Sequence, residues 1–274
     1  MLKKLGVSSS GYYDWKDRKP SPRQQKKDAY KEEIQDIYDS NYSIYGAPKI
    51  TQILHSKGHN ISERTVTRYM QEMGLRAVYV RPYTVTTISK DFTDHLRNTL
   101  DRQFSPEEPN AVWVTDITYV PTDEGFLYLS CVMDLFSRRI LAWELGRTLE
   151  TKYVIEAIKK AIRTTGKRPK IIHTDRGVQY TSDAYYEATQ GIENSYSRPG
   201  NPWDNACIES FHALIKREWL NRFRIRNYED AYSLIFEYIN AFYNTVRIHS
   251  YCGYVSPFLY EKLHEERIAK RLSA

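Results

Sequence analysis

The fold of this chain is decided by the apolar and β-branched stretch Val112-Trp113-Val114-Thr115-Asp116-Ile117-Thr118, which a single acid interrupts. Such residues favour a pleated, half-buried strand, and we expect one from Val112 to Val120. The turn residues Thr122 to Gly125 separate it from a second strand, Phe126 to Met133, which a third follows from Arg139 to Leu145. Three strands so close together in the chain predict antiparallel pairing.

Helices and strands alternate after this three-stranded unit. Apolar residues at helical or strand spacing predict, in order, a helix Leu149 to Arg163, a strand Lys170 to Thr174, a helix Ser182 to Thr189, a strand Ile192 to Ser197, and helices Trp203 to Trp219 and Tyr228 to Thr245. This order indicates an α/β fold in which a mixed five-stranded sheet is flanked by helices.

The N-terminal part of the chain has helical patterns. An amphipathic helix is expected from Pro22 to about Ser40, a short helix from Pro48 to Gly58, and another from its cap Ser62 to Gly74. Two short helices joined by a turn with glycine fit a helix-turn-helix over about 47–74, within a small all-α domain. The outward residues of its second helix would then contact DNA, namely Arg64, Thr65, Thr67 and Arg68. A plain helical hairpin is the competing interpretation.

These patterns predict four regions. Residues 1–79 form the N-terminal helical region, and residues 80–110 form a proline-containing linker with one helix around Phe92 to Phe104. Residues 111–220 hold the α/β core, and residues 221–274 form a C-terminal helical extension.

Charge and cysteine usage narrow the class of protein. Lys and Arg outnumber Asp and Glu by 40 to 34, and the resulting net charge of +6 favours a polyanionic partner without demanding one. Cys131, Cys207 and Cys252 show no spacing for a zinc site or a disulfide framework, so we expect free thiols in a reducing compartment. No stretch approaches the ~18 apolar residues of a membrane span. The expectation is a cytoplasmic protein with no membrane partner.

Three acids stand out from their surroundings. Asp116 lies within the first strand, Asp175 directly follows Ile171-Ile172, and Glu209 lies among apolar residues of a helix. Each acid alone has an ordinary structural explanation. Together they would repel one another and raise their pKa values unless divalent cations neutralise them. Two Mg²⁺ ions ~3.5–4 Å apart could then activate the attacking oxygen and stabilise the leaving oxygen of a displacement at phosphorus.

Several long motifs, occurring in one order, resemble those of a known family. They are Trp113-Val114-Thr115-Asp116-Ile117-Thr118-Tyr119, Met133-Asp134-Leu135-Phe136-Ser137-Arg138, His173-Thr174-Asp175-Arg176-Gly177-Val178-Gln179-Tyr180, Trp203-Asp204-Asn205-Ala206-Cys207-Ile208-Glu209-Ser210-Phe211, Tyr243-Asn244-Thr245-Val246-Arg247-Ile248-His249 and Ser256-Pro257. From about Tyr12 to Tyr260 the chain resembles transposases from the second reading frame of two-frame bacterial insertion sequences. These belong to the DDE superfamily of retroviral-integrase-like enzymes.

The resemblance implies a ribonuclease-H-like integrase core in which Asp116, Asp175 and Glu209 are the catalytic triad and the ligands of two Mg²⁺ ions, with Mn²⁺ as a substitute. It implies cleavage of double-stranded DNA at the terminal inverted repeats of the element and strand transfer into target DNA, by a homo-oligomer on DNA. The first-reading-frame product is an expected partner, in the nucleoid of a bacterial cytoplasm. Many members have thirty-five residues between the second Asp and the Glu, and this chain has thirty-three. We interpret the difference as a trim in a surface connection near Thr189 to Ile192.

A second group of residues is expected to contact DNA or to orient its ends: Arg176, Asn205, His212, Lys216, Arg247 and His249. Three of them, Asn205, His212 and Lys216, lie roughly on the helix face of Glu209. Structural roles compete with this expectation, since Arg247 and His249 would also serve as interdomain packing residues. His173, beside Asp175, is interpreted as a hydrogen-bonded strand-end residue in preference to a phosphate contact.

The alternative functional class is a DNA-binding protein that has no catalytic activity. The same chain could occupy DNA ends as a regulator or inhibitor of transposition, although the intact Asp116, Asp175 and Glu209 argue against a decayed binder. A plain ribonuclease H or a junction nuclease is a third reading, because a fold alone does not set the substrate.

Overall fold

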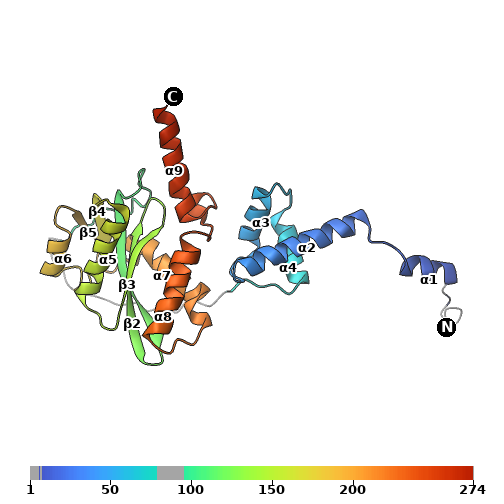
Figure 1. The fold of residues 1–274 in the computed structure, drawn as a ribbon, viewed down its shortest axis with the longest axis horizontal. Helices are drawn as coiled ribbons and strands as arrows, with labels where there is room; N and C mark the ends of the chain where they lie inside the picture. The colour runs from blue at the N-terminus through green and yellow to red at the C-terminus, as the bar shows by residue number, and fades with distance from the viewer. Residues whose placement is uncertain (1–5, 7, 79–95, 274) are drawn as a thin grey trace. The chain divides into compact units, whose positions relative to one another are not determined.

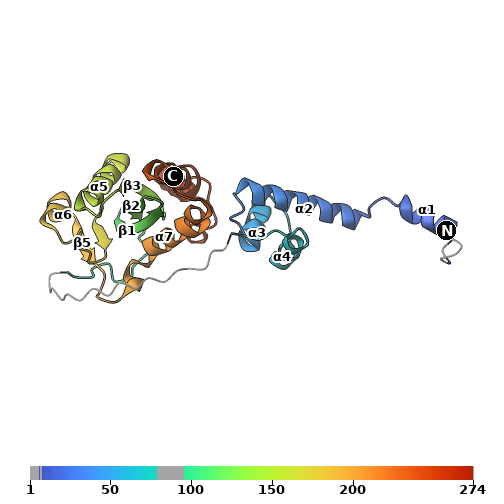
Figure 2. The ribbon, with the colours of Figure 1, turned by 90° about the horizontal axis from the view of Figure 1, so that it is seen from below.

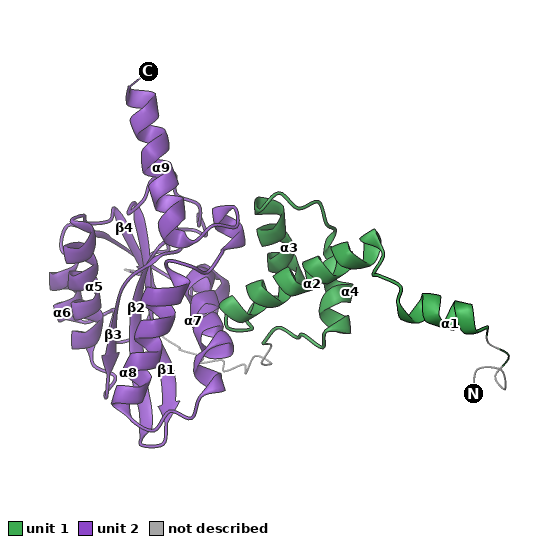
Figure 3. Cartoon of the chain, turned by 45° about the vertical axis from the view of Figure 1, so that its right-hand side comes forward, with its two compact units in different colours: residues 1–78 green, residues 79–274 purple. Residues whose placement is uncertain are grey.

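The computed structural model describes residue 6, residues 8–78 and residues 96–273 (Figure 1). The chain divides into two compact units, Met1–Val78 and Tyr79–Ala274 (Figure 3). Among the helices formed by the described residues, none is long and apolar enough to cross a membrane.

The first unit is helical and contains α1 (Ser9–Lys16), α2 (Pro22–Ser40), α3 (Ala47–Ser56) and α4 (Glu63–Glu72). The last three contact one another through buried side chains that include Ile34, Leu54 and Val66. The Ser62 hydroxyl accepts a hydrogen bond from the backbone N–H of Thr65 (3.3 Å) and caps α4. Gly58 makes the turn between α3 and α4 with φ +88°. The two short helices are confirmed, whereas the sequence patterns did not predict α1.

The second unit is built on the strands β1 (Val112–Thr122), β2 (Gly125–Asp134), β3 (Ile140–Gly146), β4 (Ile171–Thr174) and β5 (Glu193–Tyr196). They lie side by side in the order β3-β2-β1-β4-β5. β2 pairs antiparallel with β1 and with β3, while β4 runs parallel to β1 and to β5. The antiparallel unit and the mixed five-stranded sheet are therefore confirmed.

Helices cover both faces of this sheet. α5 (Thr151–Thr165) and α6 (Asp183–Ala188) lie on one face, and α7 (Ala206–Glu218) lies on the other against β1 (Figure 2). α8 (Tyr228–Phe236) continues into π-helical turns over Glu237–Tyr243, and α9 (Pro257–Leu272) projects from the unit (Figure 1). Short 3-10 helices cover Pro202–Asn205, Leu220–Arg222 and Ser250–Cys252.

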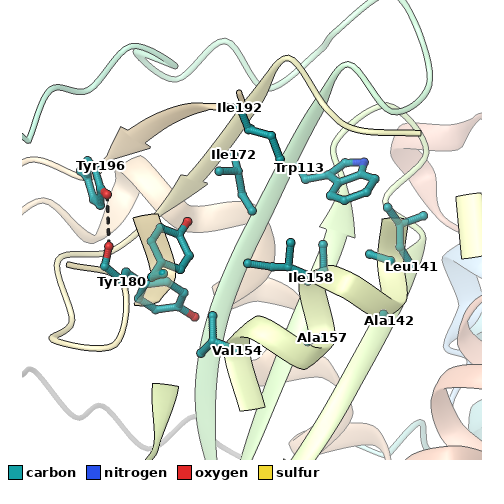
Figure 4. Close-up of a cluster of buried hydrophobic side chains, with 13 residues drawn as sticks. Trp113, Leu141, Ala142, Val154, Ala157, Ile158, Ile172, Tyr180, Ile192 and Tyr196 are labelled. Carbon is teal, nitrogen blue, oxygen red and sulfur yellow. Dashed lines mark hydrogen bonds between the residues drawn. The ribbon is translucent and has the colours of Figure 1, made fainter. Parts of the chain in front are cut away.

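A buried hydrophobic cluster lies between α5 and the sheet (Figure 4). Trp113 of β1, Ile158 of α5 and Ile172 of β4 are fully buried in it, and burial of such side chains contributes about 1.5–3 kcal/mol each. Successive side chains of a strand point to opposite faces, so an inward Trp113 directs Asp116 toward the α7 face. The core thus decides which side of the sheet carries the acid.

The helix expected around Phe92 to Phe104 is wrong over residues 96–104, which are not helical; its first residues lie outside the described part of the chain. Two backbone groups of this segment bond to β5 at the edge of the sheet instead. The Tyr196 N–H donates to the carbonyl of Arg97 (2.8 Å), and the Leu100 N–H donates to Ser195 Oγ (2.9 Å). A backbone group that is satisfied by the sheet gains nothing from forming a helix.

Candidate functional site

Strand register brings the first two acids together. In the parallel pair of β1 and β4, Val112 lies opposite Ile171 and Val114 lies opposite His173. The same register continued by two residues places Asp116 beside Asp175, which directly follows β4. Neighbouring strands lie ~4.8 Å apart, so the two carboxyl groups share one end of the sheet.

One face of α7 completes the group of acids. The Asn205 Nδ2 at the start of α7 donates to the Thr115 carbonyl (3.4 Å), and His212 Nδ1 lies 3.3 Å from Asp116 Oδ2. Glu209 is four residues after Asn205 and three before His212, so it lies on the same face of the helix. The helix therefore presents Glu209 to the end of the sheet that carries Asp116 and Asp175.

The acids raise one another's pKa values. Burial, followed by the charge of Asp116, raises the pKa of Asp175 to about 6, although the Gly177 N–H donates to its Oδ1 (2.9 Å) and acts in the opposite direction. Burial and the charges of Asp116 and Asp175 raise the pKa of Glu209 to about 7. Both residues nevertheless keep substantial exposed surface. The charge of Asp116 thus acts on both carboxyl groups, and both residues remain accessible to solvent.

Metal ligation is not pre-formed. In the described residues, no three His, Cys, Asp or Glu side chains converge closely enough to hold a metal ion. The three acids interact through their charges without forming a closed cage. An open set of carboxylates is nevertheless the kind that Mg²⁺ uses, since this ion keeps several waters and is bound by one or two carboxylates together with substrate phosphates.

Three buried polar atoms around the acids lack hydrogen-bond partners among the described residues. They are Thr174 Oγ1, Asn205 Oδ1 and His212 Nε2. Buried polar atoms are bonded in the great majority of cases, and exceptions call for an explanation such as water or a ligand. The end of the sheet near Asp116 thus has unused hydrogen-bonding capacity.

Asp204 anchors the loop that leads into α7. Its carboxylate is fully buried and accepts from Arg198 Nη2 (2.8 Å), Arg102 Nε (2.6 Å) and Asn98 Nδ2 (2.9 Å). The two arginines, Arg198 first, hold the pKa of Asp204 well below its usual range. Sequence reasoning missed this role, and the one available signal was an acid beside Trp203 within the motif that contains Glu209.

Several residues expected to contact DNA turn inward. Arg176 donates to the carbonyls of Ser197 and Leu96, both at 2.8 Å. Asn205 and His212 are only 2% and 5% exposed, and their expected role in contacting DNA or orienting its ends stays a prediction. Lys216 is half-buried; burial lowers its pKa, and the charge of Asp116 opposes that change.

Arg247 and His249, which follow the π-helical extension of α8, make contacts within the protein. Arg247 is 5% exposed and forms a two-pronged ion pair with Glu218, which favours the packing alternative over the expected DNA-backbone contact. His249 accepts a hydrogen bond from the Tyr251 N–H (3.2 Å) through Nδ1 and caps the 3-10 helix Ser250–Cys252. His173 is fully buried between Ser195 and Ser197, and burial lowers its pKa to about 4, which keeps it neutral.

The first unit holds a separate group of candidate residues. Arg64 and Arg68 of α4 are exposed, and Thr65 and Thr67 are half-buried. The threonine hydroxyls are engaged locally, because Thr67 Oγ1 donates to the Glu63 carbonyl (2.9 Å) and Thr65 Oγ1 lies 2.9 Å from Ser62 Oγ. A surface hollow of about 450 Å³ is lined by residues that include Ser62, Arg64, Thr65, Thr67, Arg68 and Gln71.

Comparison with known families defines the class of protein. Residues 106–202 and 190–257 match two families each described as an integrase core domain, and residues 25–83 match an HTH-like domain. The chain is therefore an integrase-core protein with a helix-turn-helix-like N-terminal domain.

Relatives along the full chain define the family. The transposase for insertion sequence element IS904 of Lactococcus lactis is 37% identical over 248 residues, which cover 89% of this chain and 98% of the relative. The insertion element IS600 31 kDa protein of Shigella sonnei is 36% identical over 97% of this chain and 99% of its own. The chain belongs to the family of bacterial insertion-sequence transposases. The HTLV-2 integrase catalytic core, solved in complex with magnesium, is 18% identical and covers 57% of this chain and 98% of its own, with a TM-score of 0.45.

Proposed function

We propose that this chain cleaves DNA at the ends of its insertion sequence and joins them to target DNA, with Asp116, Asp175 and Glu209 as the catalytic acids. The observation that carries the proposal is the strand register that aligns Asp116 with Asp175, together with the packing of α7, which carries Glu209, on β1. The charge of Asp116 also raises the pKa of Asp175 and of Glu209. Mutual repulsion among three acids opposes folding. Acids perturbed in this way gather at functional sites.

The chemistry of the three acids fits a pair of Mg²⁺ ions. The acids offer carboxylate oxygens, the ligands that Mg²⁺ prefers. A bound cation would also relieve the repulsion that raises the pKa of Asp175 and Glu209. The exposed surface of both residues leaves room for water and for phosphate oxygens. When bound, two Mg²⁺ or Mn²⁺ ions supply activation of the attacking oxygen and stabilisation of the leaving oxygen at phosphorus.

The reaction consists of two displacements. Water attacks a phosphodiester at the element end and frees a 3′ hydroxyl, which then attacks a phosphodiester of the target, so no covalent enzyme intermediate is required. The Gly177 N–H donates to Asp175 Oδ1, and α7, which carries Glu209, contacts Asp116 through His212. The charge of Asp116 acts on the Lys216 ammonium, and we propose that this cation contacts the reacting phosphate.

We propose that α4 recognises double-stranded DNA. Arg64 and Arg68 are one turn apart on its exposed face, where they can contact phosphate oxygens while the helix lies in the major groove. The active form that we propose is a homo-oligomer on the terminal inverted repeats, with the first-reading-frame product as a partner, at the bacterial nucleoid.

A cleavage assay tests the proposal. Labelled duplexes that carry the ends of the element are incubated with the chain, Mg²⁺ and, in parallel, the first-reading-frame product. Wild type should release a 3′ hydroxyl at the element end. Asp116→Asn, Asp175→Asn and Glu209→Gln should lose cleavage and keep DNA binding, because each change removes charge but little volume. Asp123→Asn is the matched control, since Asp123 lies in the exposed hairpin and pairs with Arg224.

Two results would contradict the proposal. Retained cleavage by Asp116→Asn would remove the acids from the mechanism. Wild type that binds the ends but never cuts them, even with the first-reading-frame product, would instead identify the chain as a regulator of transposition.

A further inference from the structure

The segment between α1 and α2, together with the residues that flank it, concentrates positive charge. Four exposed cations occur within eight residues: Lys16, Arg18, Lys19 and Arg23. Asp17 is the only acid among them, so this basic arm, residues 16–23, has a net charge of +3, half that of the whole chain. None of its four cations forms an ion pair with another described residue. Such a concentration of unpaired charge favours a polyanionic partner.

The backbone of the basic arm is extended and restricted. Ser21 has φ −61° and ψ 157°, which are values of polyproline II geometry. Pro20 and Pro22 fix their own φ angles and disfavour helical geometry at the residue before each, so Lys19 is restricted as well. Ser21 also caps α2, since its Oγ accepts from the Gln24 N–H (3.2 Å). A restricted chain loses little conformational entropy on binding, and the arm therefore meets a ligand as a thin strand that is already extended.

Ion pairs place the first turns of α2 beside the end of α4. Nζ of Lys27 and of Lys31 lie 2.7 and 2.8 Å from Glu72 Oε2, and Glu72 is the last residue of α4. Pro22 begins α2 five residues before Lys27, which is about 7.5 Å along the helix axis. The basic arm therefore begins close to α4, the helix proposed for the major groove.

The dimensions of DNA suit an arm of this length. In polyproline II geometry the five residues between α1 and α2 span about 15 Å, at ~3.1 Å per residue. A minor groove lies about half a helical turn, or ~17 Å, from the adjacent major groove. The minor groove is only ~6 Å wide, which excludes a helix but admits an extended chain. Where it is narrow, its negative potential attracts arginine and lysine.

We propose that the basic arm lies in the minor groove of the element's DNA while α4 lies in the adjacent major groove. The inference rests on the proposed function, because it assumes the contact between α4 and DNA. Arg18 and Lys19 lie in the middle of the arm and supply its contacts within the groove. The arm thereby distinguishes A·T from G·C pairs, since the N2 amino group of guanine projects into the minor groove and A·T pairs have no equivalent.

Substitution of inosine for guanine isolates the minor groove. Inosine lacks the N2 amino group and keeps N7 and O6, so the groove surface of an I·C pair differs from that of G·C only on the minor-groove side. Fluorescence anisotropy measures binding of the full chain to an element-end duplex and to its inosine counterpart at several salt concentrations. The arm variant is Arg18→Ala with Lys19→Ala. The matched control is Lys270→Ala with Arg271→Ala, which removes two adjacent exposed cations from α9.

Wild type and the control should bind the inosine duplex more tightly by about 5-fold or more, the scale of one altered base contact, because loss of the amino group opens the groove to the arm. The arm variant should bind both duplexes equally. Its slope of log K against log salt should be smaller by ~1.8, at ~0.9 for each lost cation. Its melting temperature should equal that of wild type, since both side chains are exposed and unpaired among the described residues.

The outcomes separate this inference from the proposed function. A wild-type salt slope in the arm variant would overturn the role of the arm alone. Equal binding of the two duplexes by wild type, or an unchanged inosine preference in the arm variant, would exclude the minor groove and contradict the inference as well. An equal loss in the control would show that any removal of charge has the effect, with the same conclusion. Normal DNA binding by Arg64→Ala with Arg68→Ala would overturn the proposed contact of α4, and this inference with it.

Discussion

Arg247 and Glu218 form a buried ion pair in which Nη2 lies 2.6 Å from Oε1 and Nε lies 2.7 Å from Oε2. The Tyr238 hydroxyl donates to the same carboxylate at 2.7 Å. The pair joins the last turn of α7 to the segment after α8, and the arginine and carboxylate side chains are only 6% and 8% exposed. A motif residue that the sequence suggests for DNA therefore holds the helices together.

Arg247→Ala should lower the free energy of unfolding by about 3–5 kcal/mol, because the substitution leaves the Glu218 carboxylate buried without its cation. Urea unfolding of the chain measures the loss. Arg226→Ala is the control: its ion pair with Asp230 involves a 71% exposed arginine and should contribute under about 0.5 kcal/mol. An unchanged unfolding midpoint for Arg247→Ala, with weaker DNA binding, would restore the DNA-contact interpretation.

Arg64→Ala combined with Arg68→Ala should weaken binding to duplex DNA and flatten its salt dependence. Each lost phosphate contact reduces counterion release, and with it the slope of log K against log salt, by about 0.9. Titrations at several salt concentrations measure the slope. The matched control is Lys159→Ala with Arg163→Ala, which removes two exposed charges at the same spacing from α5. Equal slopes in both double variants would identify α3 and α4 as a structural hairpin.

Asp116→Asn should stabilise the chain when no metal is present. The substitution removes a charge that raises the pKa of both Asp175 and Glu209. A gain of ~1 kcal/mol corresponds to an increase in melting temperature of about 2–4 °C for a unit of this size. Mg²⁺ should stabilise wild type and leave the variant unchanged. Asp123→Asn should show no such gain, and a lower melting temperature for metal-free Asp116→Asn would argue against repulsion at the site.

The turn after β2 predicts a pH dependence of stability. Ser137 Oγ lies 2.9 Å from Asp134 Oδ2 and 2.6 Å from Glu261 Oε1, but one hydroxyl has a single hydrogen and cannot donate to both. A protonated Asp134 resolves this conflict. Burial, and then the charge of Glu261, raises the pKa of Asp134 to about 6 from its ordinary 3.8, against the opposing hydrogen bond from Ser137.

The raised pKa of Asp134 sets the direction in which stability changes with pH. The folded state holds a proton on Asp134 that the unfolded state has already released above pH ~4. The stabilisation is therefore complete below pH ~4 and is lost as the pH rises to and through ~6, by up to about 3 kcal/mol. Urea unfolding between pH 4 and 8 should show this decline for wild type and a shallower one for Asp134→Asn. Identical slopes would mean that Asp134 is ionised throughout.

Much of the fold follows from the sequence alone, because strand and helix signals are local. The apolar run around Trp113 predicts β1, and Ser62 predicts the start of α4 by capping it. The three acids could be selected together because each interrupts or follows an apolar segment and because the long motifs around them resemble one family. That family is the one to which the chain belongs.

Only the tertiary structure decides which polar side chains form buried contacts within the protein and which stay exposed. Arg247 and Glu218 are 29 positions apart, and Asp204 and Arg102 are 102 apart, so no local pattern distinguishes a buried ion pair from an exposed DNA contact. The helix expected over residues 96–104 fails for the same reason, since the edge of the sheet bonds the carbonyl of Arg97 and the N–H of Leu100. Likewise, His212 faces Asp116 only because α7 packs on β1. Burial and distance set the strength of every charge and hydrogen bond, and both depend on which distant segments the folded chain brings together.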